Sequence, residues 1–324
     1  MSSTVQPRNP RRMPWSEVPD AVVARIEAVA GSVIESVAAS PFGFSPGFAG
    51  VVSFADGARA FLKVMSASRD PWSIEVNRRE AHVLALLPKE VPAPAFLWTF
   101  EEGDWLVIAA EAVDGEHPRA STVDADAYEV WVALGELARV EAPADLPAFH
   151  AHHADLFTQW RDLAASPELD ARLSAFGRDG QWIGSHLPQL MEWEQAAKEI
   201  TKGDALVHGD LRDDNFLLTA DGVRIVDWPH ASRGAPWLDL AGYLPSHEMY
   251  GGGSAHGMFR AHPLAEAVSS EAERFFVCTI AGYFTFQSTE PPVAALPGLR
   301  EFQRAQALPA IKWLREIADP ALAR

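Results

Sequence analysis

The chain has 324 residues, of which 48% are hydrophobic and 22% charged, so it can bury a sizeable core and wholesale disorder is excluded. It contains 27 Lys and Arg against 44 Asp and Glu, and the resulting formal net charge of −17 argues against a nucleic-acid partner. The single cysteine, Cys278, excludes an intramolecular disulfide and a zinc site built from several cysteines.

The chain has no apolar run long enough to cross a membrane, and Arg11-Arg12 is not followed by the apolar segment of an export signal. We therefore expect a cytoplasmic protein without a membrane partner. The sequence carries no indication of an oligomeric state.

The N-terminal part of the chain predicts a small lobe rich in strands. Residues 1–14 are polar and rich in proline and arginine, and we expect this leader to be loose. Ser16 is predicted to cap a helix that ends at Gly31, because the apolar residues between them recur at helical spacing. The elements that follow are strands over 51–54 and 58–65 on either side of an Asp-Gly turn, a helix over 73–87 and a strand over 106–110.

The remainder of the chain predicts a larger, mainly helical lobe. Its amphipathic segments are interrupted by a second hairpin, over 216–227, with another Asp-Gly turn. The predicted helices cover 128–141, 187–200, 271–286 and 302–317. We therefore predict an α+β, bilobal fold, with an N-terminal lobe over 15–112, a C-terminal lobe over 113–324 and a cleft between them.

The most informative segment of the chain presents three polar groups in a loop, followed by a fourth at the end of the second hairpin. These residues are His208, Asp210, Asn215 and Asp227. Phosphoryl transfer needs one carboxylate to orient a nucleophilic hydroxyl and accept its proton, and an amide with a second carboxylate to hold Mg²⁺. A solvated Asp-rich loop is the alternative, but a chance match rarely continues into a hydrophobic hairpin that ends in Asp.

This segment resembles the aminoglycoside phosphotransferase family, a branch of the protein-kinase-like fold that also includes choline, homoserine and other small-molecule kinases. The resemblance rests on the loop and hairpin above and on Gly234-Ala-Pro-Trp237-Leu-Asp239-Leu-Ala. It covers residues 20–320 and is sharp only over 206–242. By this likeness the small sheet-containing lobe would bind the nucleotide, and the helical lobe would carry the catalytic loop and bind the acceptor.

The resemblance assigns a role to each polar residue of the segment. It implies that Asp210 is the catalytic base and that Asn215 and Asp227 are ligands of Mg²⁺. His208 and Asp239 would be supports that hydrogen-bond the catalytic loop and take no part in the chemistry.

A kinase of this kind also needs a strand lysine on the nucleotide phosphates and a helix glutamate that holds it. Lys63 lies on the outgoing strand of the first hairpin, where that lysine is expected. Glu80 lies in the following helix and is the predicted partner, with Glu75 as the alternative. A lone lysine in a strand is otherwise usually a surface residue.

The segment Gly43-Phe-Ser45-Pro-Gly47 matches the G-x-S-x-G nucleophile elbow, which makes a serine hydrolase that uses Ser45 the alternative from another reaction class. Pro46 argues against it, because an elbow needs a backbone N–H after the serine and proline has none. The segment also lacks the required strand before it and helix after it. We expect it to be a loop over the phosphates, with Ser45 facing the nucleotide, as in the Ser-Pro loop of the phosphotransferases.

Four further residues are assigned by position. Glu111 and Val113 follow the last predicted strand of the first lobe, where main-chain groups would hold the base of the nucleotide. Phe61, two residues before Lys63 on the same strand face, should narrow the nucleotide pocket and influence which purine is accepted. Arg212 could stabilise the transferring phosphoryl group or pair with Asp213 and Asp214.

Three other features are interpreted as structural. The histidines of 150–153 lack the helical spacing of a zinc site, and nearby prolines predict a loop with solvent-facing or hydrogen-bonded histidines. Gly251-Gly-Gly253-Ser predicts a flexible loop on the far side of the molecule. Trp228 is expected to pack beneath the site.

The sequence therefore predicts an ATP- or GTP-dependent, Mg²⁺-requiring phosphotransferase that acts on a hydroxyl of a small molecule. The negative charge favours a cationic acceptor such as an aminoglycoside or another amine-bearing compound. Its expected sources are Asp210, Asp213, Asp214 and Asp227 at the cleft mouth and Glu248, Glu271 and Glu273 on the acceptor side. A metabolic kinase for an amino alcohol, sugar or macrolide, and a nucleotide-binding pseudoenzyme, remain alternatives.

Overall fold

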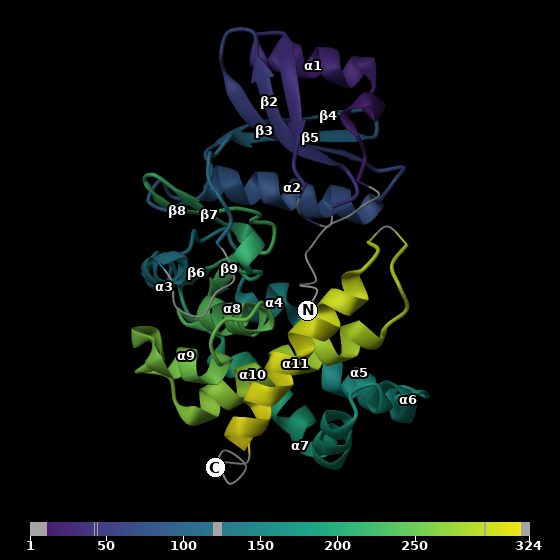
Figure 1. The fold of residues 1–324 in the computed structure, drawn as a ribbon, viewed down its shortest axis with the longest axis vertical. Helices are drawn as coiled ribbons and strands as arrows, with labels where there is room; N and C mark the ends of the chain where they lie inside the picture. The colour runs from purple at the N-terminus through teal and green to yellow at the C-terminus, as the bar shows by residue number, and fades with distance from the viewer. Residues whose placement is uncertain (1–11, 42, 44, 119–124, 295, 319–324) are drawn as a thin grey trace.

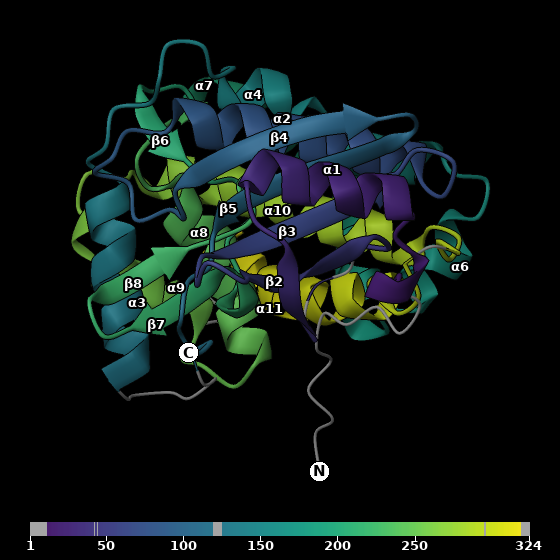
Figure 2. The same ribbon diagram turned by 90° about the horizontal axis from the view of Figure 1, so that it is seen from above.

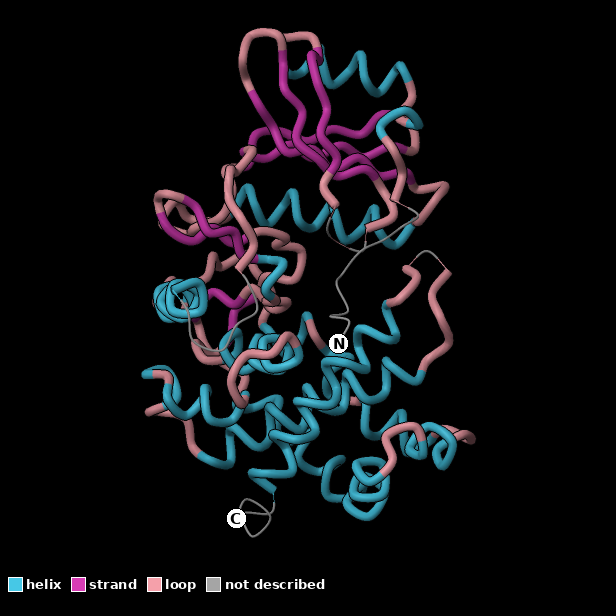
Figure 3. Tube along the Cα trace, viewed as in Figure 1, coloured by secondary structure: helices cyan, strands magenta, loops and turns pink. Residues whose placement is uncertain are grey.

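The computed structural model describes residues 12–41, 43, 45–118, 125–294 and 296–318, which form two lobes (Figure 1). The smaller lobe contains a five-stranded sheet and two helices, and the larger lobe is mainly helical. Figure 3 shows that the strands outside the smaller lobe are confined to short pairs next to it. The predicted α+β, bilobal fold is confirmed.

The sheet of the smaller lobe is antiparallel throughout, in the order β1-β2-β3-β5-β4. β3 is its central strand and carries Lys63. The strand bounds are β1 Ile34–Ala39, β2 Phe48–Phe54, β3 Arg59–Ser66, β4 Phe96–Glu102 and β5 Trp105–Glu111.

The two faces of this sheet have different partners. Helix α1 (Asp20–Ala30) lies across the outer face (Figure 2), where Val22 and Ile26 pack with Leu62 of β3. Helix α2 (Pro71–Leu86) covers the other face, beside Met65. Because successive strand side chains point to opposite faces, burying Leu62 under α1 directs Lys63 towards α2 and the larger lobe.

Local signals explain how several elements begin and end. Gly57, in the turn between β2 and β3, has φ 87°, a conformation that favours glycine, and the predicted hairpin is present. The N-cap of α2 is Asp70, whose carboxylate accepts a hydrogen bond from Trp72 N, and Pro71 follows at the first helical position. Helix α1 ends before Gly31, as predicted.

The start of the smaller lobe differs from the prediction. Ser16 lies in a short 3₁₀ turn (Trp15–Glu17), and α1 begins only after Pro19, so Ser16 is not its cap. Residues 1–11 of the predicted loose leader lie outside the described residues. Met13, also assigned to that leader, is buried and donates its N–H to Pro46 O at 2.9 Å.

The core of the larger lobe is built around α10, which packs against both α7 and α11 (Figure 1). Cys278, on α10, is buried there, and its carbonyl accepts a hydrogen bond from Trp160 Nε1 at 2.9 Å. The helices are α3 Ala125–Leu137, α4 Phe149–His152, α5 Gln159–Ala165, α6 Leu169–Ser174, α7 Arg178–Ile200, α8 Leu238–Met249, α9 Ala255–Ala261, α10 Ser270–Thr289 and α11 Leu299–Ala318.

Two strand pairs lie next to the smaller lobe. Strands β7 (Phe216–Thr219) and β8 (Gly222–Ile225) form the predicted second hairpin, and β6 (Ala205–Val207) pairs with β9 (Ser232–Gly234).

No helix of the described part is long and apolar enough to cross a membrane.

Candidate active site

A cavity of about 1000 Å³ lies where the two lobes meet. The sheet contributes Phe61 and Lys63, α2 contributes Glu80, and the larger lobe contributes Asn215 and Asp227. The predicted nucleotide- and metal-binding residues of the two lobes therefore line one cavity, whereas the predicted catalytic residues Asp210 and Arg212 are not among its lining residues.

Lys63 joins the two lobes through its ammonium group. Its Nζ lies 2.6 Å from Glu80 Oε2 and 2.6 Å from Asp227 Oδ1. Burial alone would lower the pKa of Lys63, but the carboxylates of Asp227 and Glu80 outweigh it and raise that pKa above its ordinary value. The alternative partner, Glu75, instead pairs with Arg78 on the surface of α2.

Asp227 has an unusual backbone conformation. Its φ of 69° is the only positive value at a non-glycine position in the described chain. Burial would raise the pKa of its carboxyl, but the Lys63 ammonium overcomes that effect and keeps the pKa below its usual range. Left-handed backbone at such a residue costs free energy and is typical of functional sites.

The loop that carries Asp210 is held by buried hydrogen bonds. Asp239 Oδ2 accepts from His208 N at 2.7 Å, and Oδ1 accepts from Gly209 N at 2.9 Å. The His208 ring donates from Nε2 to Val226 O at 3.1 Å and accepts at Nδ1 from Asp210 N at 3.3 Å, which defines its neutral tautomer. His208 and Asp239 therefore lie where supports of this loop were predicted.

Burial shifts both supporting residues toward their neutral forms. It lowers the pKa of His208 to about 4. It raises the pKa of Asp239 to about 6, although two backbone N–H groups favour its charged form. Trp228, buried after Asp227, packs edge-on against the His208 ring with centroids 4.6 Å apart, as expected of a residue beneath the site.

Asp210 is paired with Arg212. Arg212 Nη1 lies 2.5 Å from Asp210 Oδ2, and its Nε lies 3.0 Å from Asp214 Oδ1. The Asp210 side chain is 36% exposed, so one face of its carboxylate stays open to a substrate. Arg212 therefore pairs with Asp214, which was one of its two predicted roles. It also contacts the candidate base, Asp210.

Asn215 is positioned by the same loop. Its side-chain Nδ2 donates to Asp210 O at 2.7 Å, and its backbone carbonyl accepts from Val226 N at 2.9 Å. The side chain is buried and lines the cavity together with Asp227. An amide oxygen and a carboxylate are hard ligands of the kind that Mg²⁺ takes. The donor set therefore fits the predicted metal.

Asp213 lines the cavity, as its predicted place at the cleft requires, but its carboxylate is not a free charge there. It is buried, and its Oδ1 accepts from Tyr243 Oη at 2.6 Å. The same hydroxyl lies 2.9 Å from His247 Nδ1. Tyr243 and His247 lie one turn apart on α8, a spacing visible in the sequence, but nothing local connected them to Asp213.

Ser45 lines the cavity on the loop between β1 and β2. Its hydroxyl donates to the Met65 sulfur at 3.3 Å, and Pro46 follows it. The loop joins two strands, whereas a nucleophile elbow leads from a strand into a helix. The structure therefore gives no support to a serine hydrolase at this position.

Glu111 and Val113 line the cavity where β5 leaves the sheet. The Glu111 N–H donates to Ala95 O at 2.8 Å, and its carboxylate pairs with Arg224 of the second hairpin. Phe61 lines the same cavity, as predicted from its strand face.

The histidine segment is partly helical, not a loop. It forms α4, and the rings of His152, His153 and His230 gather behind the catalytic loop. Burial lowers the pKa of His152 to about 3 and that of His153 to about 2. Among the described residues, no group of three or more His, Cys, Asp or Glu is arranged to hold a metal ion.

The glycine loop after α8 is not remote from the site, because Tyr250, immediately before it, lines the cavity.

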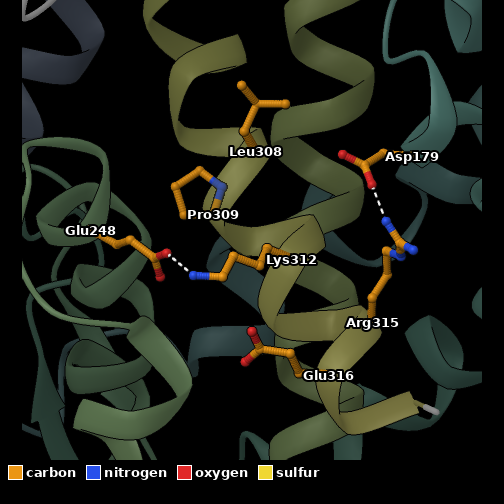
Figure 4. A pocket seen from close by; sticks show the side chains of 7 residues that line it. All are labelled: Asp179, Glu248, Leu308, Pro309, Lys312, Arg315 and Glu316. Atoms are coloured by element: carbon orange, nitrogen blue, oxygen red, sulfur yellow. Dashed lines mark hydrogen bonds and ion pairs between the residues drawn. The ribbon is translucent and has the colours of Figure 1, made fainter. Parts of the chain in front are cut away.

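Two glutamates assigned to the acceptor side have other roles. Glu273 is buried and bound to Arg260 and Trp313. Glu248 pairs with Lys312 in a separate cavity of about 530 Å³ beside α11, where Arg315 pairs with Asp179 (Figure 4).

Sequence comparison supports the interpretation of this geometry. The model of a phosphotransferase enzyme family matches residues 47–276, from the start of β2 into α10. A comparison with curated protein sequences gives no match.

Several solved structures share the fold. A choline kinase from Streptococcus pneumoniae has a TM-score of 0.59 at 13% identity, with 91% of this chain and 98% of that chain covered. A thermostable mutant of the aminoglycoside phosphotransferase APH(4)-Ia, in a ternary complex with ADP and hygromycin B, has a TM-score of 0.55 at 14% identity, with 92% and 97% covered. An aminoglycoside phosphotransferase from Streptomyces rimosus, in complex with ADP and streptomycin, has a TM-score of 0.51 at 18% identity, with 81% and 98% covered.

At these identities the neighbours establish the protein-kinase-like fold, and the family match establishes membership. The match covers more than half of the chain and includes Lys63, Glu80, Asp210, Asn215 and Asp227. The resemblance inferred from the sequence is thus confirmed, and this chain belongs to the phosphotransferase enzyme family.

Proposed function

We propose that this protein transfers the terminal phosphate of ATP or GTP to a hydroxyl group of a small molecule in the presence of Mg²⁺. The observation that carries the proposal is the position of Lys63. Its ammonium contacts Glu80 from one lobe and Asp227 from the other at 2.6 Å each, in a cavity large enough for a nucleotide.

Asp210 would act as the base of this reaction. It would orient the acceptor hydroxyl and take its proton as the hydroxyl oxygen bonds to the terminal phosphorus. The bond between that phosphorus and the bridging oxygen breaks, and the nucleoside diphosphate leaves with the electron pair. Arg212, 2.5 Å from Asp210, would hold this carboxylate and stabilise charge on the transferring phosphoryl group.

The nucleotide would be held by groups from both lobes. Lys63 would neutralise the phosphates while Glu80 fixes its position, and Ser45 would face them from the loop above. Glu111 and Val113 would hold the base through main-chain groups, with Phe61 narrowing the pocket for the purine. All of these residues line the same cavity.

Asn215 and Asp227 would hold Mg²⁺. When bound, the ion would neutralise charge on the phosphate oxygens. Such sites commonly use one or two protein ligands and complete their coordination with phosphate and water, which agrees with the pair of side chains on this wall. The left-handed backbone of Asp227 also supports a functional role for this carboxylate.

The acceptor would be a small hydroxyl compound, and the net charge of −17 supports a cationic one such as an aminoglycoside or amino alcohol. The support comes from the overall charge and from Asp210. Glu248 and Glu273 do not contribute, because each is already paired with a cation of the chain.

The test is Mg²⁺-dependent turnover of ATP and GTP over a panel of aminoglycosides, macrolides, peptide antibiotics, amino alcohols and sugars. Asp210→Asn should lower kcat by about 1000-fold or more and leave nucleotide affinity within about threefold. Arg212→Ala should lower kcat less than Asp210→Asn does. Retained turnover in Asp210→Asn, or a loss that comes only from weaker nucleotide binding, would refute the assignment. Nucleotide binding without turnover of any acceptor would instead favour a pseudoenzyme.

A further inference from the structure

Arg12 lines the nucleotide cavity, although it lies outside the matched family region and precedes the first helix of the fold. The chain reaches the cavity here because Met13 is buried in the core beneath α1 and its N–H donates to Pro46 O at 2.9 Å. This anchor places Arg12 beside the loop between β1 and β2.

The Arg12 guanidinium bridges the two sides of that loop. Nη1 donates to Ser40 O at 3.0 Å, and Nε donates to Ser45 O at 3.3 Å. Gly43 lies between them, and a Cβ at this glycine would be 2.8 Å from Arg12 Nη2. The guanidinium therefore packs directly against the loop that would cover the phosphates.

Arg12 and Lys63 differ in the groups that contact their positive charges. Lys63 contacts two carboxylates, whereas the hydrogen-bond partners of Arg12 within the described chain are carbonyl oxygens. These two bonds use two of the five N–H groups of a guanidinium. The group is also partly buried, and burial lowers its pKa while the negative charge of Asp227 raises it. A partly buried cation without a contacting anion favours binding of an anionic ligand.

The composition of the cavity wall makes this cation important. Among the described lining residues, Arg12 and Lys63 carry the permanent positive charges, against the six carboxylates of Glu80, Glu111, Glu116, Asp213, Asp214 and Asp227. Arg212 pairs with Asp214 and Arg224 pairs with Glu111 from outside the lining. Even with these two cations counted, the carboxylates outnumber the positive charges, so the wall repels a triphosphate. Arg12 is the cation that this wall carries beside the loop between β1 and β2.

We propose that Arg12 is a phosphate-binding residue, which clamps the loop between β1 and β2 and contacts the phosphates of the bound nucleotide. The inference rests on the proposed function, because that function supplies the ligand. It assigns a binding role to a segment before α1.

The experiment measures binding of ATP, ADP and adenosine to the full chain by calorimetry with Mg²⁺ present. Arg12→Ala should weaken ATP and ADP binding by about tenfold or more, because a charge-assisted contact is lost, and leave adenosine binding within about twofold. Millimolar guanidinium should restore part of the loss. Arg25→Ala, which removes an exposed arginine on α1, is the charge-matched control and should bind all three ligands as the parent does.

Two further variants make the result independent of the stability of Arg12→Ala. Arg12→Lys retains the charge without the two-pronged contact and should show an intermediate loss for ATP and ADP. Gly43→Ala should weaken ATP more than adenosine, because its Cβ would displace Nη2 and because alanine strains the loop at this φ of 94°. An unchanged ratio of ATP to adenosine affinity in the Arg12 variants would overturn this inference and leave the proposed function intact. A parent protein that binds no nucleotide would overturn the proposed function as well.

Discussion

Lys63 shows how one side chain depends on two others from different parts of the fold. It is held between Glu80 and Asp227, and the Glu80 side chain is almost fully buried. Removing the charge of Glu80 leaves the ammonium attached only to the residue proposed to bind the metal. Lys63 would then move toward Asp227 and away from the phosphates.

Glu80→Gln should therefore lower kcat/KM for the nucleotide by about 100-fold, because a misplaced phosphate ligand loses its catalytic alignment. The measurement is steady-state kinetics at saturating acceptor. Glu75→Gln is the matched control on the same helix, since Glu75 pairs with Arg78 on the surface, and it should change kcat/KM by less than about twofold. Equal losses in the two variants would contradict the assignment of Glu80.

Residue pairs differed in how far the sequence could predict them. Lys63 and Glu80 are 17 positions apart on a strand and the helix that follows it, so their meeting follows from local order. Tyr243 and Asp213 are 30 positions apart on different elements, and their contact depends on how α8 packs. Arg12 lies before any predicted element, and only the burial of Met13 brings it to the cavity.

At the scale of elements, His208 links the catalytic loop to β8 and the residues after it. Its ring bonds Val226 O on one side and Asp210 N on the other. The pKa of this ring is lowered by burial to about 4, compared with an ordinary value of 6.5. The unfolded chain therefore binds a proton at pH 5 that the folded chain does not, and folding loses free energy as the pH falls from 6.5 towards 4.

The free energy of unfolding should thus fall by about 2 kcal/mol between pH 6.5 and pH 5 on account of His208. Urea unfolding at the two pH values measures it. His208→Asn should remove this part of the slope, because the amide keeps a donor for Val226 O and does not titrate. His82→Asn, at an exposed position on α2, should keep the full slope, and the same slope in both variants would count against His208 as its source.

Elements marked by local turn chemistry were predicted, and elements defined by pairing were not. Both Asp-Gly hairpins are present where the sequence placed them. Strands β1 and β4 were missed, and both lie at the edges of the sheet with only one strand partner. Neither edge strand has a fully buried residue. Burial along β1 does not alternate, and β4 alternates only between half-buried and exposed positions, with the apolar Leu97 among the exposed ones, so neither strand has the clear sequence pattern of a buried strand.

At the scale of the whole molecule, a protein with a net charge of −17 is proposed to bind a nucleotide, which is itself an anion. The cavity wall carries more carboxylates than permanent cations among its described residues. Nucleotide binding must therefore depend on a divalent metal more strongly than a neutral cavity would require. Removing the metal with EDTA should abolish turnover and weaken ATP binding by about 10-fold to 100-fold.

Asp227 should be the main source of this metal dependence, because its carboxylate faces the phosphates when no ion intervenes. Asp227→Asn removes one negative charge from the wall, so metal-free ATP should bind about threefold to tenfold more tightly than to the parent chain. The same variant should lose turnover by about 1000-fold with Mg²⁺ present, because a proposed metal ligand is impaired. Calorimetry with and without Mg²⁺ separates the two effects. Asp221→Asn removes an equal charge at the exposed turn of the second hairpin and should change neither quantity. If metal-free affinity rises equally in both variants, the effect comes from net charge and not from Asp227.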